Sequence, residues 1–466
     1  MKILFQNHSS ILMHSDDQYL LTDPWYNRPA FGSWLPSLAP YIHPTYLAAL
    51  GDKISILISH GHDDHFDDRL LELFNKKTQI ITAAFKAPSV INRLKRLGFE
   101  NVVTVGDEEV QIGDKLISSY IVEEFSHDDA AFLIRNKAGA VLHLNDNYNV
   151  FSQKHEKLIK SRVGNYDKDS VLLFSQTNSA SGFPLNYRRI STTDKIKILR
   201  TKVAKMVESG LRNAENLGLK KMFSYAGYAS AYVRDKDYEK VSLFPSARFL
   251  KRLLSDEGIK STVDIVDLYP GDSISLPDGK VSSAFVRDYQ DSEIKNITDN
   301  FYKIYGNINE CISYRKIDII PDYLDSWLDD FLKELFAFTQ RRIQGVDSHY
   351  NELSQKTFSI DVHHKGESII QKTLSFSDGL VEYDSKANKI CYVSANMIFK
   401  VLTGESLFED LYTGYNAEWD RNPQHIYNRD IIMMITMFSY VYKNRLLPNY
   451  LSKYTQDNNP VKVKLK

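Results

Sequence analysis

The sequence contains only two cysteines, Cys311 and Cys391, among its 466 residues. A disulfide scaffold needs several cysteine pairs, and structural zinc modules or iron–sulfur clusters need cysteines at short spacings. The residues of this sequence can build none of these by themselves. We expect both cysteines to be buried and chemically inert.

An excess of charge of one sign and long apolar runs are also missing. Lys and Arg together number 58 and Asp and Glu 59, so no overall basic field exists to hold a nucleic acid by counterion release, and we expect no such partner. No apolar stretch is long enough to span a bilayer, and residues 1–15 lack the basic and apolar segments of a signal peptide. These absences predict a cytoplasmic protein without a membrane span.

The composition that remains is that of an ordinary globular protein, with 43% hydrophobic and 25% charged residues. A chain of 466 residues exceeds the size at which one hydrophobic core keeps growing, so we expect at least two domains. Beyond about residue 290 the composition changes, and acidic and aromatic segments with helical spacing appear. We therefore predict one domain over residues 1–295 and a C-terminal α+β region over residues 296–466.

Short apolar runs of strand character alternate with segments in which apolar residues recur at helical spacing. Helices are predicted over residues 68–75, 87–97, 192–216, 323–341 and 395–402. Strands are predicted over residues 2–5, 10–13, 19–22, 54–58, 101–105, 110–112, 116–123, 130–134, 140–144, 221–226, 357–362, 368–376 and 389–393. Strands with inserted helices indicate an α/β fold for the N-terminal part.

A dense group of metal-ligand residue types follows the apolar run at 54–58. His60, His62, Asp64 and His65 give the spacing H-x-H-x-D-H. A strand ending in a tight loop can turn the first two histidines toward one point, and the aspartate and third histidine toward a second point nearby. Imidazole and carboxylate suit Zn²⁺, and also Mn²⁺ or Fe²⁺. The alternative is a polar surface loop with solvated histidines, which the ligand order and the preceding strand disfavour.

This pattern resembles the metallo-β-lactamase superfamily, whose fold is an αββα sandwich. The resemblance implies that His60 and His62 share one ion with a third histidine, for which His127 is the candidate. Asp64 and His65 would serve a second ion, and Asp146, at a strand end, would bridge the two. A solvated turn remains the alternative for both His127 and Asp146.

The sequence departs from the family at one ligand. The family often supplies a further histidine to the second ion from late in the domain, but no histidine occurs here between His155 and His349. The second position is then open, filled by another residue type, or completed from the C-terminal part. We therefore expect one or two ions, with the second held chiefly by Asp64, His65 and Asp146 and the more labile of the two.

A closer resemblance is to the metallo-β-lactamase domain of CMP-N-acetylneuraminate hydroxylases and to the ascorbate-6-phosphate lactonase branch. It is carried by the strings at 21–25, 29–31, 180–184 and 223–228, and it covers roughly residues 1–290. The hydroxylases also have a Rieske iron–sulfur domain, which these two distant cysteines cannot form. Candidate substrate residues are Trp25, Arg28, Tyr187, Arg188 and Tyr228. For Trp25 core packing is the alternative, and for Tyr187 and Arg188 a solvated charged face.

These observations leave three functions open. The leading one is a metallohydrolase in which a metal-bound hydroxide attacks an ester, lactone or phosphodiester of a small sugar-like or nucleotide-like substrate, with Asp64 and Asp146 as catalytic carboxylates. The second is an iron-dependent oxygenase that acts on a sugar or nucleotide-sugar and takes electrons from a partner. The third is a binding protein with a vestigial site.

The C-terminal region carries little chemistry that the sequence can identify. The strings at 376–379, 393–395 and 402–404 loosely resemble sterol-carrier-protein-like domains. The alternative is a cap or a dimerisation region, and a homo-oligomer is compatible with it.

Overall fold

The structure is a computed structural model that describes residues 1–26, 29–32, 34–36, 38–121, 129–147, 149–178, 181–226, 229–231, 246–283, 320–344, 348–426 and 428–455. The chain divides into an N-terminal unit of Met1–Ala30, Trp34–Ser179 and Ile196–Gly306, and a C-terminal unit of Phe31–Ser33, Ala180–Lys195 and Asn307–Lys466. The expected division between residues 295 and 296 lies outside the described residues and stays a prediction.

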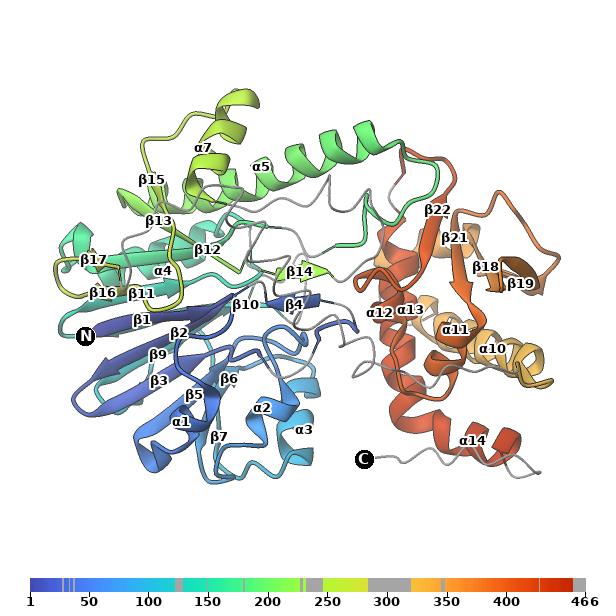
Figure 1. The fold of residues 1–466 in the computed structure, drawn as a ribbon, viewed down its shortest axis with the longest axis horizontal. Coiled ribbons are helices and arrows are strands. Elements are labelled where there is room, and N and C mark those ends of the chain that lie inside the picture. The colour runs from blue at the N-terminus through green and yellow to red at the C-terminus, as the bar shows by residue number, and fades with distance from the viewer. Residues whose placement is uncertain are drawn as a thin grey trace. The chain divides into compact units, whose positions relative to one another are not determined.

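Two mixed sheets form the centre of the N-terminal unit (Figure 1). The first has the order β17 (Lys280–Ser282), β16 (Ser273–Ser275), β1 (Lys2–Asn7), β2 (Ser10–Ser15), β3 (Gln18–Thr22), β5 (Ile54–Ile58), β6 (Gln79–Ala83) and β7 (Val102–Val105). The second has the order β15 (Asp264–Val266), β13 (Lys221–Tyr225), β12 (Val171–Gln176), β11 (Gly139–His143), β10 (Ala130–Asn136), β9 (Lys115–Ile121) and β8 (Val110–Ile112). A short pair joins β4 (Trp34–Pro36) to β14 (Ala229–Ala231).

Alternating side chains on the strands explain the layers. On β5, Leu57 packs with residues of both sheets in one buried cluster, whereas Ile56 and Ile58 belong to a cluster with helix residues on the opposite face. Successive strand residues point to opposite faces, so an apolar run of this kind is buried on both sides. The helices on the first sheet are α1 (Pro44–Ala48), α2 (Asp68–Leu71) and α3 (Ser89–Arg96), and those of the second-sheet side are α4 (Gln153–Val163), α5 (Thr192–Asn216) and α7 (Ala247–Asp256).

The strand directions create a common edge. Strands β3, β5, β6 and β7 run parallel to one another, and so do β11, β12, β13 and β15. Loops that follow the carboxyl ends of parallel strands gather at one edge of a sheet, where ligands are commonly bound. The predicted αββα sandwich is confirmed, and this edge is where the H-x-H-x-D-H string begins.

Two of the predicted helices have the bounds that the sequence predicted, and one is shorter. The helices expected at 192–216 and 395–402 are α5 and α11 with the same bounds. The helix expected over residues 68–75 ends at Leu71, because Leu73 and Phe74 instead bond three residues back in tight turns. No helix among the described residues is long and apolar enough to cross a bilayer.

The C-terminal unit has one five-stranded sheet with helices, as expected of an α+β region. The sheet order is β20 (Gly379–Val381), β19 (Glu367–Ser375), β18 (Thr357–His364), β21 (Lys389–Ser394) and β22 (Glu418–Arg421). The helices are α10 (Leu324–Ile343), α11 (Ala395–Leu402), α12 (Phe408–Tyr412), α13 (Arg429–Val441) and α14 (Leu447–Thr455). The resemblance of this region to sterol-carrier-protein-like domains stays a prediction.

A buried lysine lies in the core of the C-terminal unit. Lys389 on β21 is fully buried, donates a hydrogen bond to the Tyr187 hydroxyl, and lies 5.0 Å from the ring centre of Tyr412 and 5.5 Å from that of Trp419. Burial, aided by the nearby Arg421 guanidinium, lowers the pKa of Lys389 to about 7. Protonation of Lys389 is therefore less favourable in the folded chain than in the unfolded chain.

This equilibrium predicts a specific pH dependence of stability. Between about pH 7 and 10 the unfolded chain keeps a proton on Lys389 that the folded chain releases, so the free energy of unfolding should rise with pH by up to about 1.4 kcal/mol per unit. The variant Lys389→Met lacks this pH dependence. The free energy of unfolding of wild type should therefore rise relative to that of the variant as the pH rises. Denaturant unfolding across this range measures the difference. Exposed Lys386→Met is the control and should track wild type, and a Lys389→Met curve parallel to wild type would contradict the shifted pKa.

Candidate metal centre

The loop after β5 is fixed on both sides by hydrogen bonds. Arg93 on α3 donates to the carbonyl oxygen of Gly61 at 2.8 Å and to Asp63 at 2.9 Å, and its guanidinium lies 4.2 Å from the ring centre of Phe66. At the far end Asp67 caps α2 by accepting from the Leu70 amide. These contacts hold the histidines between them in a defined geometry.

The first group of candidate ligands contains His60 and His62. The His60 Nε2 and His62 Nδ1 atoms are hydrogen-bonded at 2.7 Å, and Asp129 Oδ1 lies 3.8 Å from His60 Nε2. The ligand atoms of these three residues all lie within 4.8 Å of one another. The two imidazole nitrogens would have to move apart to share an ion, since 2.7 Å is a hydrogen-bond distance.

The second group contains Asp64, His65 and Asp146. His65 Nε2 lies 3.7 Å from Asp64 Oδ2 and 3.4 Å from Asp146 Oδ1. The other Asp146 oxygen, Oδ2, lies 3.8 Å from His60 Nε2. One carboxylate therefore extends an oxygen toward each group, which is the arrangement that a bridging ligand requires.

A buried carboxylate behind the cluster orients His65. Asp23, at the end of β3, accepts from the Ser59 amide and hydroxyl at 2.7 Å each, and its Oδ2 lies 3.0 Å from His65 Nδ1. A carboxylate at Nδ1 favours the proton on that atom and leaves Nε2 to face the cluster. His143 is engaged elsewhere, since its Nε2 lies 3.1 Å from the carbonyl oxygen of Ser9.

The pKa values follow from this crowding. Burial, reinforced by His65 and His62, holds the pKa of His60 well below its ordinary value. Burial also acts to lower the pKa of His65, but Asp64, Asp146 and Asp23 outweigh it and hold that pKa well above the ordinary value. For Asp146 burial is outweighed by His65 and His60, so its pKa is lowered. The buried carboxylates of this cluster are therefore stable in their ionised form only with positive charge close to them.

These residues fit a divalent ion. The donor set is imidazole and carboxylate, which suits zinc, manganese or iron. Within the described part of the chain, His65 Nε2 and Asp64 Oδ1 are buried atoms without a hydrogen-bond partner. Such atoms are costly unless something binds them, by about 1–3 kcal/mol each. His60 and His62 with Asp129 and Asp146 could hold one ion, and Asp64 and His65 with Asp146 another.

The remaining predicted site residues fall into three groups. His127, Arg28 and Tyr228 lie outside the described residues, so their roles stay predictions. Trp25 is buried with its ring 4.9 Å from that of His8, and Tyr187 is buried in the core of the C-terminal unit. That burial favours the packing interpretation that the sequence left open for Trp25, whereas Tyr187 is not part of a solvated face.

Arg188 also has partners in the C-terminal unit. It donates to Glu418 at 2.6 Å and lies 3.8 Å over the ring of Tyr392. Both side chains of this ion pair are exposed, at 38% and 58%, which agrees with the solvated charged face given as the alternative. A substrate role for Arg188 stays a prediction.

Sequence analysis missed two residues of the cluster, Asp129 and His8. Asp129 lies in the same string as His127, two positions later, and an acidic ligand in that string could have been considered. His8 lies in the turn between β1 and β2, 52 positions before His60, so only the three-dimensional hairpin brings it to Asp64. A sequence search for a histidine late in the domain could not find it.

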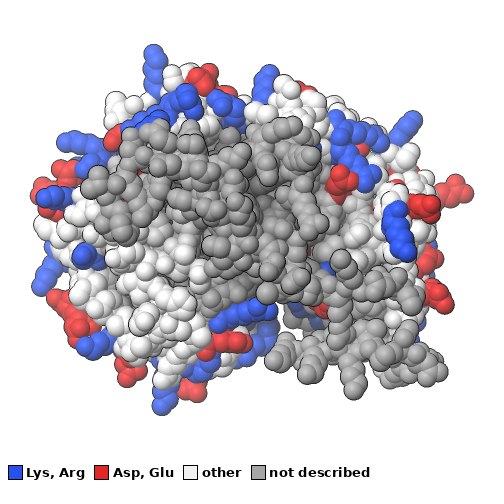
Figure 2. Space-filling view, viewed as in Figure 1, with Lys and Arg blue, Asp and Glu red and all other residues white. Residues whose placement is uncertain are grey.

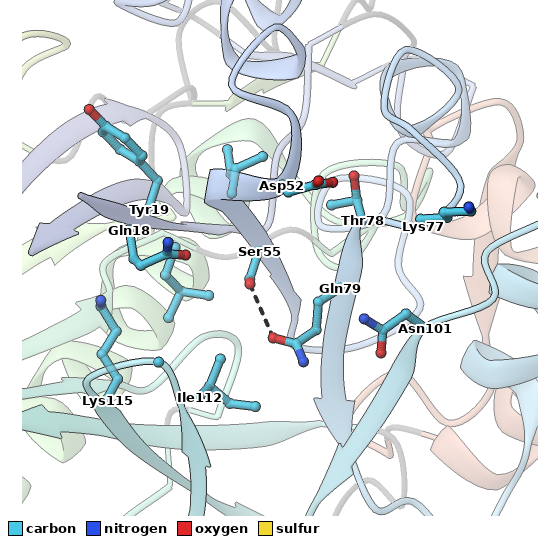
Figure 3. Close-up of a pocket in the computed structure, with 13 residues that line it drawn as sticks. Gln18, Tyr19, Asp52, Ser55, Lys77, Thr78, Gln79, Asn101, Ile112 and Lys115 are labelled. Carbon is cyan, nitrogen blue, oxygen red and sulfur yellow. Dashed lines mark hydrogen bonds between the residues drawn. The ribbon is translucent and has the colours of Figure 1, made fainter. Parts of the chain in front are cut away.

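A cavity of about 320 Å³ lies elsewhere in the N-terminal unit (Figure 3). Its lining includes Ile54 and Ser55 at the start of β5 and Gln79 at the start of β6, and Ser55 donates to Gln79 at 3.2 Å. The histidines follow the opposite, carboxyl end of β5. The cavity is therefore separate from the metal-ligand cluster.

Surface charge gives no further pointer to a ligand. On the described part of the face in Figure 2, basic and acidic side chains are interspersed.

Comparison with known proteins agrees with this geometry. Residues 2–163 match the family model of the beta-lactamase superfamily domain. A protein named as a Rieske 2Fe-2S iron–sulfur protein from Mycolicibacterium smegmatis is 26% identical over 155 residues, which are 31% of this chain. The chain spans about 30% of the length of that relative.

Solved structures resemble the chain at low identity. The metallo-beta-lactamase fold protein YhfI from Bacillus subtilis is 13% identical, with a TM-score of 0.35 over 59% of this chain and 99% of that one. The diiron beta-hydroxylase CmlA from Streptomyces venezuelae is 17% identical, with a TM-score of 0.38 over 59% of this chain and 54% of that one.

The contacts of Asp23 generate a prediction. In Asp23→Asn the side-chain amide would donate to His65 Nδ1, which moves the imidazole proton to Nε2 and blocks that atom as a ligand. We expect metal affinity to fall about 10–100-fold with the fold retained, since asparagine tolerates the left-handed backbone here, φ 36°. Chelator competition measures the affinity, with exposed Asp17→Asn as the control. Equal affinities for the Asp23 variant and wild type would show that this carboxylate does not orient a ligand.

Proposed function

We propose that this chain, whose residues 2–163 carry a beta-lactamase superfamily domain within a metallo-β-lactamase fold, is a metal-dependent hydrolase. The observation that carries the proposal is the convergence of His60, His62, Asp64, His65 and Asp146 at the carboxyl ends of the strands. A polar surface loop would not bury these side chains together with their ligand atoms facing one another. The substrate class that we propose is an ester, lactone or phosphodiester of a small sugar-like or nucleotide-like molecule.

The bound ion would lower the pKa of a water molecule and polarise the substrate oxygen. The chain's own residues perform the positioning. His60 and His65 have side chains with no exposed surface, whereas those of Asp129 and Asp146 are 20% and 17% exposed. Water and substrate therefore reach the cluster from the side of the two carboxylates.

The carboxylates have a role on that open side. Asp146, facing both histidine groups, can accept a hydrogen bond from the attacking water and hold it on the solvent side of the cluster. Asp64 lies deeper, at 6% side-chain exposure, and is placed to bind rather than to meet substrate. His60 keeps a neutral nitrogen available as a ligand, since burial disfavours a proton on it.

A second candidate function is oxygen chemistry at an iron centre, with an external electron donor. The observation in its favour is that the curated relative from Mycolicibacterium smegmatis bears a Rieske iron–sulfur name. This sequence has two cysteines, so any such electrons would come from a partner. Metal analysis and a visible absorption spectrum of the purified chain separate iron from zinc or manganese.

The proposal predicts the behaviour of His60→Ala and His62→Ala. Each variant should keep the circular dichroism of wild type, because the buried sheets do not depend on this loop. Each should lose bound metal. Each should also lower the rate of hydrolysis by more than the roughly 10–100-fold that follows removal of a residue hydrogen-bonded to a metal ligand. Metal content is measured by elemental analysis, and hydrolysis on a panel of lactones, esters and phosphodiesters.

His364→Ala, in the C-terminal unit, serves as the matched control and should retain wild-type metal content. The proposal is wrong if both loop variants keep the wild-type metal stoichiometry. If metal is lost but neither the variants nor wild type hydrolyses any member of the panel, the site is a metal centre with another function.

A further inference from the structure

The turn between β1 and β2 brings a histidine to the second metal position. β1 ends at Asn7 and β2 begins at Ser10, so His8 and Ser9 form the turn. His8 has a backbone φ of 42°, a left-handed conformation that is uncommon for a residue with a side chain. Strained residues of this kind persist only where the surroundings enforce them, and they cluster at functional sites.

Hydrogen bonds to both sheets enforce this conformation. The amide of Ala226, directly after β13, donates to the carbonyl oxygen of His8 at 2.9 Å. The carbonyl oxygen of Ser9 accepts from Thr22 Oγ1 at 3.1 Å and lies 3.1 Å from His143 Nε2. The turn is therefore tied to β3, β11 and β13, and these contacts place His8 beside the cluster.

Neither nitrogen of the His8 imidazole has a hydrogen-bond partner among the described residues. Its ring is 4% exposed and packs at 74° to the ring of Trp25, and both of its nitrogens are buried. Its Nε2 lies 3.4 Å from Asp64 Oδ2 without hydrogen-bond geometry. A buried imidazole whose two nitrogens are both unsatisfied is unfavourable, and coordination of an ion by Nε2 would remove that cost.

Three distances between the surrounding atoms are close to those around a tetrahedral ion. Ligands at about 2.0–2.2 Å from one ion lie about 3.3–3.6 Å from each other. His8 Nε2 to Asp64 Oδ2 is 3.4 Å, Asp64 Oδ2 to His65 Nε2 is 3.7 Å, and His65 Nε2 to Asp146 Oδ1 is 3.4 Å. The ligand atoms of His8, Asp64 and His65 all lie within 4.8 Å of one another.

We infer that His8 is a ligand of the second ion, together with Asp64, His65 and Asp146, and that it occupies the position for which no late histidine exists. This inference rests on the proposed metal-dependent function. It replaces the expectation of a ligand-poor second position, since four protein ligands close a tetrahedral site. The ion held by His8 is then retained well and is not the labile one.

A rival role for His8 is that of a proton-bearing partner of Asp64 without coordination. A thiolate at this position separates the two, since cysteine is itself a metal ligand whose bond to Co²⁺ gives an intense near-ultraviolet charge-transfer band. The test uses the full chain loaded with Co²⁺ alone. The variants are His8→Asn, because asparagine tolerates a left-handed backbone, and His8→Cys. His14→Asn and His14→Cys, on β2 of the same hairpin, are the matched controls.

We expect His8→Asn to lose the cobalt of one position on mild chelation while His14→Asn keeps it. We expect His8→Cys, and not His14→Cys, to show the thiolate–cobalt band. Wild-type stoichiometry and chelation rate in His8→Asn, together with no band in His8→Cys, would overturn the role of His8 and leave the proposed function standing. A wild-type chain that binds no cobalt would overturn both, and far-ultraviolet circular dichroism confirms that each variant is folded.

Discussion

The constraint on which this structure depends is negative charge buried at the ends of its central strands. Asp23, Asp64 and Asp146 converge on His65, and two of these carboxylates have almost no exposed surface. Carboxylates taken out of water are stable only when positive charge and hydrogen-bond donors reach them. In the metal-free chain a proton on His65 supplies part of that charge. A divalent ion would displace that proton, bind the freed nitrogen and the buried carboxylate oxygens, and supply more positive charge. The site is therefore built to be completed by a cation.

The fold places this charge with backbone rather than with long side chains. Four residues around the cluster have positive φ values: His8, Asp23, Asn145 and Ala226. Each lies one or two positions after the last residue of a strand. Such conformations are unfavourable for residues other than glycine. Their grouping at one edge of two sheets indicates that packing of the sheets supplies the free energy that holds the ligands in position. The strands therefore position the site, and the turns after them orient its side chains.

The sequence predicted what is local in the chain. The string His60 to His65 could be interpreted because its ligands are close neighbours and follow an apolar strand, and α5 because its apolar spacing is unbroken over 25 residues. His8 could not be found in this way, because its role depends on a hairpin meeting a distant loop. The same holds for Lys389, an ordinary lysine in sequence that becomes fully buried only when β21 packs against the segment containing Tyr187. Contacts between distant segments, and the choice between packing and binding for aromatic residues, require the folded structure.

The most direct test of the account is anomalous diffraction from crystals of the full chain grown with Co²⁺, recorded at the cobalt absorption edge. The account predicts one anomalous peak within coordination distance, about 2.0–2.2 Å, of His60 and His62 and a second beside His8, Asp64 and His65, with Asp146 reaching both. An anomalous map without a peak at this cluster, although Co²⁺ is present in the crystal, would contradict the claim that the buried charge is completed by a metal ion.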